Sequence, residues 1–344
     1  MELFYISCSK VHLQIKISFS AALEGSKMWK YIGTKECNDF LLSLKLLNCK
    51  NEKRYLKTLY SISNNIEKNY KIYKIKKRNG KYRTIYEPSS LLMHIQKQIL
   101  NNILNNKSIS KYAKAYHKGI SLKDNAIPHI NKDIILKLDI KDFFENISFI
   151  DIYNTCFPIE YFPKSVGMLL TYLCTYDEHL TQGSPTSAYI SNLVMKDFDE
   201  SIGVWCENNN ISYTRYSDDM TFSGNFIPKD IIIKVRKMLN KLGLQLNNNK
   251  IHVITRSSCQ HVTGIVVNEK AQVNSKYRKE IKKEIYYIKK FGLISHLNRT
   301  ENPLTPKSYI DSLYGRILYV LQINDNDSEF KEYKQYILNL KKTI

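Results

Sequence analysis

The sequence predicts an α+β protein, and three features of the chain lead to that prediction. Two segments, 70–88 and 211–224, have the pattern of β-hairpins. The segment DIILKLDI at 133–140 is a mostly apolar run that ends in an acid, which is typical of a buried strand. Helical patterns lie between these strands and continue to the end of the chain. Strands and helices in this order favour an α+β core with helical additions at both ends.

The first elements each carry a local signal. Apolar and polar residues alternate over 11–19, which predicts a half-buried strand. The pattern over 38–70 is helical. The hairpin over 70–88 turns at Asn79-Gly80, and this dipeptide is the strongest short-range hairpin signal.

The later elements follow from caps and turn residues. Ser89 and Ser90 supply N-caps for a helix that runs to about Asn106. The segment 181–202 predicts a turn and then a helix, with Pro185 near the first helical turn, where proline is tolerated. The remaining predicted elements are a helix over 228–243, short strands near 251–255 and 261–267, and basic amphipathic helix from Ser275 onward.

Composition limits the partner and the compartment. The 344 residues carry a net charge of +20, which favours a polyanionic partner, nucleic acid before an anionic membrane surface; a basic, merely soluble surface is the alternative. The 7 cysteines are scattered without a Cys-x-x-Cys pair, so we expect reduced thiols with neither disulfides nor a zinc site. No apolar run approaches the roughly 18 residues of a membrane span, and the first residues lack the basic segment of a signal peptide. We therefore expect a cytoplasmic protein with no membrane partner.

Three carboxylates are candidates for a metal site. Asp139 ends the buried strand, and Asp218-Asp219 lie at the tip of the second hairpin. If the two strands are neighbours, the three acids meet at one edge of the sheet, where they repel each other unless cations neutralise them. Partial sets of oxygen ligands suit Mg²⁺, and two such ions about 4 Å apart can activate a hydroxyl and stabilise a leaving pyrophosphate. The alternative is three solvated turn acids.

Four motifs occur together in a recognisable order. They are LDIKDFF at 138–144, QGSPTSAYISN at 182–192, YSDD at 216–219 and LGLQLNNNK at 242–250. In this order and spacing they resemble the palm motifs of reverse transcriptases.

Two shorter motifs narrow the resemblance to retron reverse transcriptases. NAIPH at 125–129 is similar to that group's Asn-Ala-x-x-His signature, and VTG at 262–264 to its Val-Thr-Gly signature. RTIYEPS at 83–89 and SLYGRILYV at 312–320 also resemble fingers and thumb segments. The resemblance covers roughly 70–325, whereas the strand pattern near the start departs from the helical opening usual in the group.

The resemblance implies a right-hand polymerase fold, in which the palm is an antiparallel sheet with packed helices. The implied divisions are an N-terminal region over 1–69, mainly helical with a possible early strand; fingers over 70–132; a palm over 133–268 with inserted fingers elements around 150–180; and a basic helical thumb over 269–344.

The resemblance also assigns roles at the carboxylates. It implies that Asp139, Asp218 and Asp219 are catalytic and hold Mg²⁺, with two ions expected and Mn²⁺ as a substitute. Ile140 is the further residue of the implied metal site.

Two segments are candidates for nucleotide contacts. The resemblance places a bulky residue, Phe144, against the sugar, where its ring would exclude a ribonucleotide 2′-hydroxyl; core packing is the alternative for Phe143 and Phe144, and we expect it for one of them. Arg83, and less strongly Lys76, are expected to clamp triphosphate oxygens; solvated hairpin charge is the alternative.

Three further residues are assigned to the nucleotide site. Gln182 and Gly183 are expected to contact the nascent base pair, with glycine allowing close approach, and they also form a turn before a helix. Lys250 is expected to neutralise or protonate the departing pyrophosphate; a surface lysine is the alternative.

The two short signatures imply contacts with structured RNA. Asn125, His129, Thr263 and Gly264 are the residues concerned. A lone histidine is more often a satisfied structural residue than a functional one, and Thr263-Gly264 can simply turn the chain. The basic, tyrosine-containing helix after Ser275 is expected to follow a phosphate backbone.

The resemblance therefore implies an RNA-directed DNA polymerase that uses deoxynucleoside triphosphates (dNTPs) to copy a cognate non-coding RNA. A 2′-hydroxyl of that RNA would prime synthesis, and the product would be multicopy single-stranded DNA (msDNA) in a branched RNA–DNA hybrid. Anti-phage defence with an effector protein of the same operon is implied as well. The alternatives are another bacterial reverse transcriptase, of the group II intron-like or abortive-infection type, and a non-catalytic RNA-binding scaffold with the same fold.

Overall fold

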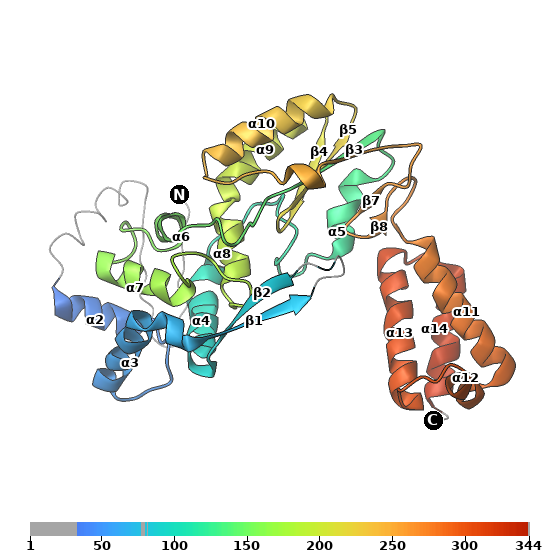
Figure 1. The fold of residues 1–344 in the computed structure, drawn as a ribbon, viewed down its shortest axis with the longest axis horizontal. Helices are drawn as coiled ribbons and strands as arrows, with labels where there is room; N and C mark the ends of the chain where they lie inside the picture. The colour runs from blue at the N-terminus through green and yellow to red at the C-terminus, as the bar shows by residue number, and fades with distance from the viewer. Residues whose placement is uncertain (1–32, 77–79, 81, 343–344) are drawn as a thin grey trace.

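The computed structural model describes residues 33–76, 80 and 82–342 (Figure 1). The strand expected over 11–19 lies outside the described residues. The structure combines helices with two- to four-stranded antiparallel sheets, which confirms the α+β prediction.

The first described elements are two helices where the sequence showed one helical pattern. They are α2 (Thr34–Ser43) and α3 (Glu52–Asn64), followed by a 3₁₀ helix at Ile66–Asn69. Lys45 between them has a positive φ of 51°, which ends the helical path. The Asn51 side chain accepts a hydrogen bond from the Arg54 N–H and so caps α3.

The predicted first hairpin is present as a two-stranded ribbon. β1 (Tyr70–Lys76) pairs antiparallel with β2 (Tyr82–Pro88). The Ser89 hydroxyl then accepts from the Leu92 N–H at 3.4 Å and caps α4 (Ser90–Asn102), as predicted. A 3₁₀ helix at Leu104–Asn106 completes this segment. Figure 1 shows the ribbon lying apart from the larger sheet.

The largest sheet has the order β4-β5-β3-β6, and all its pairs are antiparallel. Its strands are β3 (Ile134–Asp139), β4 (Ser212–Tyr216), β5 (Asp219–Gly224) and β6 (His252–Thr255). The predicted buried strand, β3, is therefore an inner strand that pairs with β5 of the predicted second hairpin. This pairing brings the ends of two sequence-distant strands together.

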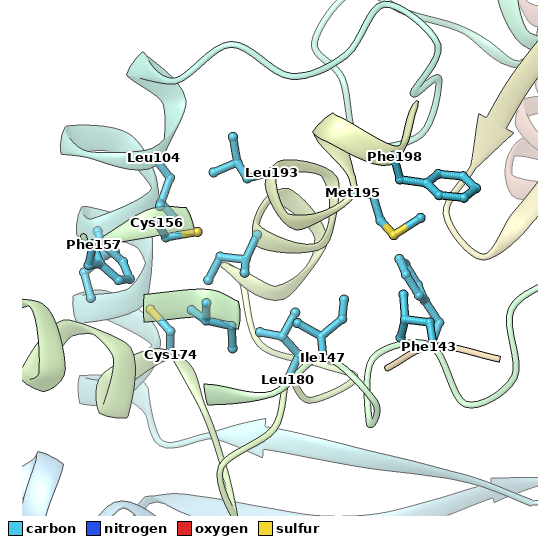
Figure 2. Close-up of a cluster of buried hydrophobic side chains, with 14 of the residues drawn as sticks. Leu104, Phe143, Ile147, Cys156, Phe157, Cys174, Leu180, Leu193, Met195 and Phe198 are labelled. Carbon is cyan, nitrogen blue, oxygen red and sulfur yellow. The ribbon is translucent and has the colours of Figure 1, made fainter. Parts of the chain in front are cut away.

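The main hydrophobic core contains residues of this sheet and of helices that lie beside it and farther from it (Figures 1 and 2). The helices include α6 (Phe149–Cys156), α7 (Lys164–Cys174), α8 (Ser187–Val194), α9 (Lys196–Asn208) and α10 (Pro228–Asn240). The side chains labelled in Figure 2 are Leu104, Phe143, Ile147, Cys156, Phe157, Cys174, Leu180, Leu193, Met195 and Phe198. The six described cysteines are all free.

The C-terminal part has a second core of its own. A three-stranded sheet of order β7-β8-β9 leads into four helices, of which the first two are separated by Gly292 alone (Figure 1). These elements are β7 (His261–Val262), β8 (Ile265–Val266), β9 (Gln272–Val273), α11 (Ser275–Phe291), α12 (Leu293–Arg299), α13 (Pro306–Ile323) and α14 (Ser328–Lys341). Because Ile265 pairs with Val273, the small sheet crosses the division expected between 268 and 269.

One short helix lies between the two cores. α5 (Leu122–Ala126) continues into a 3₁₀ helix at Ile127–His129, and Figure 1 shows it between the large sheet and the C-terminal helices. Within residues 33–76, 80 and 82–342, no helix has the length and apolarity needed to cross a membrane.

Candidate active site

The three aspartates meet at one edge of the large sheet. Asp139 is the last residue of β3 and lies directly opposite Asp219, the first residue of β5. The Ile140 N–H donates to the Asp218 carbonyl oxygen at 3.0 Å, which ties the hairpin turn to the end of β3. The expectation that strand pairing brings the three acids together is confirmed.

The turn that carries the acids is held in an unusual backbone conformation. Ser217, between β4 and Asp218, has a positive φ of 61°, which non-glycine residues seldom adopt. Its hydroxyl accepts from the Tyr116 hydroxyl at 3.2 Å, and its carbonyl oxygen accepts from Arg215 Nη1 at 2.9 Å. Contacts from two directions therefore fix the residue that precedes the aspartate pair.

A buried ion pair supports this turn from inside the protein. Arg215 is 0% exposed and donates to Asp199, with Nε 2.9 Å from Oδ1 and Nη2 2.6 Å from Oδ2. Tyr213 donates its hydroxyl to the same carboxylate at 2.8 Å. Arg215 Nη2 also donates to Asn192 Oδ1 at 3.1 Å. Burial disfavours the charge on Arg215, but Asp199 outweighs burial and raises the pKa of the guanidinium.

This frame, defined here as Arg215, Asp199, Tyr213 and Asn192, was not identified from the sequence. The available signal was an arginine inside an otherwise well-buried strand, since a buried charge requires a partner. The partner could not be read locally, because Asp199 lies on α9, 16 residues before the arginine.

Crowding of negative charge changes the proton affinity of the aspartates. Burial, and then the charges of Asp218 and Asp139, raise the pKa of Asp219 to about 6. Burial also raises the pKa of Asp218, and Asp139 adds to the effect. Lys250 Nζ binds Asp139 Oδ2 at 2.6 Å; partial burial disfavours its charge, but Asp139 outweighs burial and raises the pKa of the ammonium.

The donor set fits a divalent cation. Among residues 33–76, 80 and 82–342, no three acidic, histidine or cysteine side chains are arranged as a ready metal cluster. Asp139 Oδ2 instead faces the Lys250 ammonium, and Asp139 Oδ1 accepts from Asn247 Nδ2 at 3.1 Å. The Lys250 ammonium thus already compensates part of the negative charge of the three aspartates. The raised pKa values of Asp218 and Asp219 show that negative charge is crowded here, and a hard divalent cation bound by carboxylate oxygens would neutralise it.

A cavity of about 270 Å³ opens beside these acids. Asp139 and Asp219 line it together with Lys250. Thr263 and Gly264, in the turn between β7 and β8, line it as well. The structure therefore brings the VTG segment to the carboxylates, a relation that the sequence alone did not indicate.

The structure corrects the expectation for two residues of the NAIPH segment. Asn125 is 1% exposed and His129 is 0% exposed, so their side chains cannot meet an RNA at the surface. His129 instead bonds the hydroxyls of Thr214 and Ser223, at 2.9 and 2.7 Å. Burial lowers the pKa of this histidine to about 3, so it is neutral. His129 is therefore a structural residue with satisfied hydrogen bonds, which is the alternative that the sequence left open.

The residues expected at the nucleotide are more scattered. Arg83 lies on the exposed ribbon opposite Ile75, and Lys76 is exposed on the same ribbon. No hydrogen bond or ion pair among the described residues joins Arg83 to the aspartates. Phe143 is buried while Phe144 is half-buried, which agrees with a core role for one of the pair.

Gly183 serves a close approach between segments of the chain itself. It has a φ of 125°, and an added Cβ would stand 2.5 Å from the Tyr86 carbonyl oxygen. The Tyr86 N–H donates to the carbonyl oxygen of half-buried Gln182 at 2.8 Å. This turn therefore fastens the ribbon to the main core.

Comparison with known proteins agrees with this geometry. The family model for reverse transcriptase (RNA-dependent DNA polymerase) matches residues 75–279. Retron Ec86 reverse transcriptase of Escherichia coli is 32% identical over 226 residues, covering 64% of this chain and 70% of the relative. Retron Ec83 reverse transcriptase of Escherichia coli is 32% identical over 250 residues, covering 67% and 78%.

Solved structures give a weaker likeness. A foamy viral protease-reverse transcriptase in complex with double-stranded DNA has a TM-score of 0.45 at 14% identity, over 80% of this chain and 39% of that one. Telomerase from Candida albicans with a telomeric RNA fragment has a TM-score of 0.44 at 10% identity, over 78% and 66%.

Proposed function

This chain belongs to the retron reverse transcriptases, and on that premise we propose that it copies a cognate non-coding RNA into msDNA. As a member of this family it is an RNA-directed DNA polymerase with a right-hand α+β fold and an RNA template. The identity of the template, the priming group and the biological role are the proposed parts.

One observation carries the catalytic proposal. Asp139 and Asp219 are direct register partners, and the backbone contact at Ile140 holds Asp218 beside them. Reverse transcriptases use divalent metal ions, and we assign Mg²⁺ binding to these three aspartates and Ile140, with Mn²⁺ as a substitute. When bound, two such ions would lower the barrier to nucleotidyl transfer by neutralising charge on the attacking and leaving oxygens.

The chain's own residues prepare this site for a cation. Lys250 holds one oxygen of Asp139, so its ammonium would leave that oxygen if a metal ion were to bind there. Near the carboxylates, the ammonium is placed to neutralise the pyrophosphate leaving group. The frame around Arg215 keeps the turn fixed, so that the carboxylates need not reorganise between catalytic cycles.

Other residues are proposed to select and orient the incoming dNTP. Arg83 on the ribbon is the proposed contact for triphosphate oxygens, with Phe144 against the sugar. Gln182 and Gly183 are proposed to meet the nascent base pair while they anchor the ribbon. The exposed position of Arg83 and the half-buried ring of Phe144 support these assignments.

We propose that a ribose 2′-hydroxyl of the non-coding RNA primes the reaction. Its oxygen forms a bond to the α-phosphorus of the dNTP, the bond to the β-phosphate bridge breaks, pyrophosphate leaves, and the hydroxyl proton passes to water. The msDNA product is proposed to act in anti-phage defence with an effector protein encoded in the same operon. Family membership supports this part of the proposal.

The test uses cells that express this gene together with its flanking non-coding DNA. Small nucleic acids are separated on a denaturing gel before and after RNase, beside cells that carry Asp218→Asn/Asp219→Asn. We expect a discrete DNA band that shortens slightly after RNase and is missing in the variant.

Two results would redirect the assignment. A wild-type protein that is present with its RNA but gives no band would remove the retron reaction and favour an intron-like or abortive-infection enzyme. A variant that retains RNA binding and all biological activity would favour the non-catalytic scaffold.

A further inference from the structure

The NAIPH segment connects two parts of the active site. Asn125 Nδ2 donates to Thr263 Oγ1 at 3.3 Å, across 138 residues of sequence. Four residues later, His129 bonds Thr214 on β4 and Ser223 on β5, the two strands of the catalytic hairpin. The segment 125–129, which we call the bracket, thus holds the VTG turn at one end and the catalytic hairpin at the other.

The two ends of the bracket, Asn125 and His129, are buried, and Asn125 has one unused polar atom. Asn125 is 1% exposed, and its Oδ1 has no hydrogen-bond partner. An unpaired buried amide oxygen is costly. The Asn125 amide therefore contributes through its bond to Thr263, since that is the one hydrogen bond its side chain makes among the described residues.

The backbone of the VTG turn also requires support. Thr263 has a positive φ of 46°, which is unfavourable for a β-branched residue, and Gly264 follows with a φ of 86°. Strained residues of this kind persist where the surroundings hold them, and they are common at functional sites. Asn125 supplies such a restraint from within the protein.

The cavity beyond this turn suits a sugar with a neighbouring phosphate. Its volume of about 270 Å³ is roughly nine times that of a liquid water molecule, and lies below the range typical of larger ligands. Lys137 and Lys250 supply positive charge, and Asp139 and Asp219 form the catalytic side. Because Thr263 Oγ1 accepts from Asn125, its own hydroxyl hydrogen remains free for an acceptor in the cavity.

We propose that this cavity receives the ribose of the priming RNA nucleotide, and that Asn125 is a positioning residue that holds the Thr263 hydroxyl toward that ribose. This inference rests on the proposed RNA priming. The bracket fixes the VTG turn relative to the catalytic hairpin, so the ribose hydroxyl is presented to the aspartates at the first transfer. Later transfers start from a deoxyribose 3′-end and depend less on the contact.

The test compares two reactions of the same variants. RNA-primed synthesis is measured as the RNA-linked DNA band from cells that carry the gene and its flanking non-coding DNA. DNA-primed synthesis is measured with purified protein on poly(rA) annealed to oligo(dT). The variants are Asn125→Ala, Thr263→Val and Thr263→Ser, and His261→Ala is the control, since His261 is exposed on β7 and does not line the cavity.

We expect Asn125→Ala and Thr263→Val to lose about tenfold more RNA-primed than DNA-primed synthesis, because Thr263→Val removes one hydrogen bond to substrate and Asn125→Ala removes the bond that positions it. Thr263→Ser keeps the hydroxyl and should restore the wild-type ratio, and His261→Ala should not change it. Equal losses in both reactions, or no loss in either, would overturn the inference.

If the proposed RNA priming is itself wrong, the two reactions give a different result. If the wild-type protein extends oligo(dT) but yields no RNA-linked DNA, RNA priming itself is wrong, and the ribose assignment falls with it. If the wild-type protein performs both reactions and Thr263→Ser fails to restore the ratio, the hydroxyl contact alone is wrong.

Discussion

The catalytic hairpin and the β1–β2 ribbon are both two-stranded, yet they are stabilised in opposite ways. Around the catalytic hairpin, buried polar groups form hydrogen bonds on both faces of the strands, with the Arg215 frame on one face and His129 on the other. The ribbon is exposed along most of β1 and at the start of β2, including large apolar residues such as Ile75 at 49% and Tyr82 at 62%.

This difference is consistent with the two tasks that we propose for these regions. Nucleotidyl transfer needs carboxylates held in one geometry, and a buried hydrogen-bonded network provides that rigidity. A surface that binds a new dNTP in each cycle, as proposed for the ribbon, needs accessible cations and aromatic rings instead. The two regions meet at the Gln182-Gly183 turn, which bonds the Tyr86 backbone.

Breaking the frame should have the largest effect on stability. Arg215→Met leaves Asp199 buried without its ionic partner, and we expect a loss of about 3–5 kcal/mol in the free energy of unfolding. Urea denaturation measures it. The double variant Arg215→Met/Asp199→Leu should recover much of the stability; a single variant as stable as the wild type would contradict the role of the frame.

Loosening the junction should have a smaller effect. Gly183→Ala forces a side chain against the Tyr86 carbonyl oxygen at an unfavourable φ, and we expect a cost of about 1–3 kcal/mol. Gly80→Ala is the matched control, because Gly80 also has a positive φ but has open space around its Cβ position. If the two variants lose equal stability, backbone conformation alone explains the cost and the close approach does not.

The buried histidine predicts a pH-dependent difference. The pKa of His129 is about 3 in the folded protein and about 6.5 when unfolded, so its contribution to stability is fully present above pH 6.5 and is lost as the pH falls toward 3. When the pH is lowered from 7.5 to 5, the free energy of unfolding of the wild type should fall by about 2 kcal/mol more than that of His129→Gln, as measured by urea denaturation. Parallel pH profiles for the two proteins would show that this histidine is not buried and neutral.

On the ribbon, substitutions should change substrate affinity rather than stability. Arg83→Ala should raise the KM for dNTP about tenfold while unfolding changes by no more than about 0.5 kcal/mol. Lys74→Ala, on the opposite face of the ribbon by register, should change KM less than about twofold. Steady-state kinetics with purified protein would distinguish the two, and equal effects would indicate general electrostatic attraction.

The same contrast explains what could be predicted from the sequence. The paired strands, the helix after Ser89 and the meeting of Asp139 with Asp219 follow from local patterns, because hairpin signals and strand ends are encoded within short segments. The family motifs also predict the chemistry that we propose for the site.

Contacts between distant segments could not be read in this way. The bond between Asn125 and Thr263 and the pairing of Arg215 with Asp199 arise only when separate elements pack together. For the same reason the sequence predicted an RNA contact for His129, whereas the structure shows it buried and bonded to Thr214 and Ser223.

The most direct measurement of the central claim is dTMP incorporation by purified protein on poly(rA) annealed to oligo(dT), with Mg²⁺ and dTTP. Asp219→Asn is compared with Asp133→Asn, an exposed acid just before the opposite end of β3. We predict that Asp219→Asn reduces the rate by about a thousandfold or more without loss of stability, and that Asp133→Asn stays within about twofold. Incorporation by Asp219→Asn at the wild-type rate would contradict the assignment of catalysis to these aspartates.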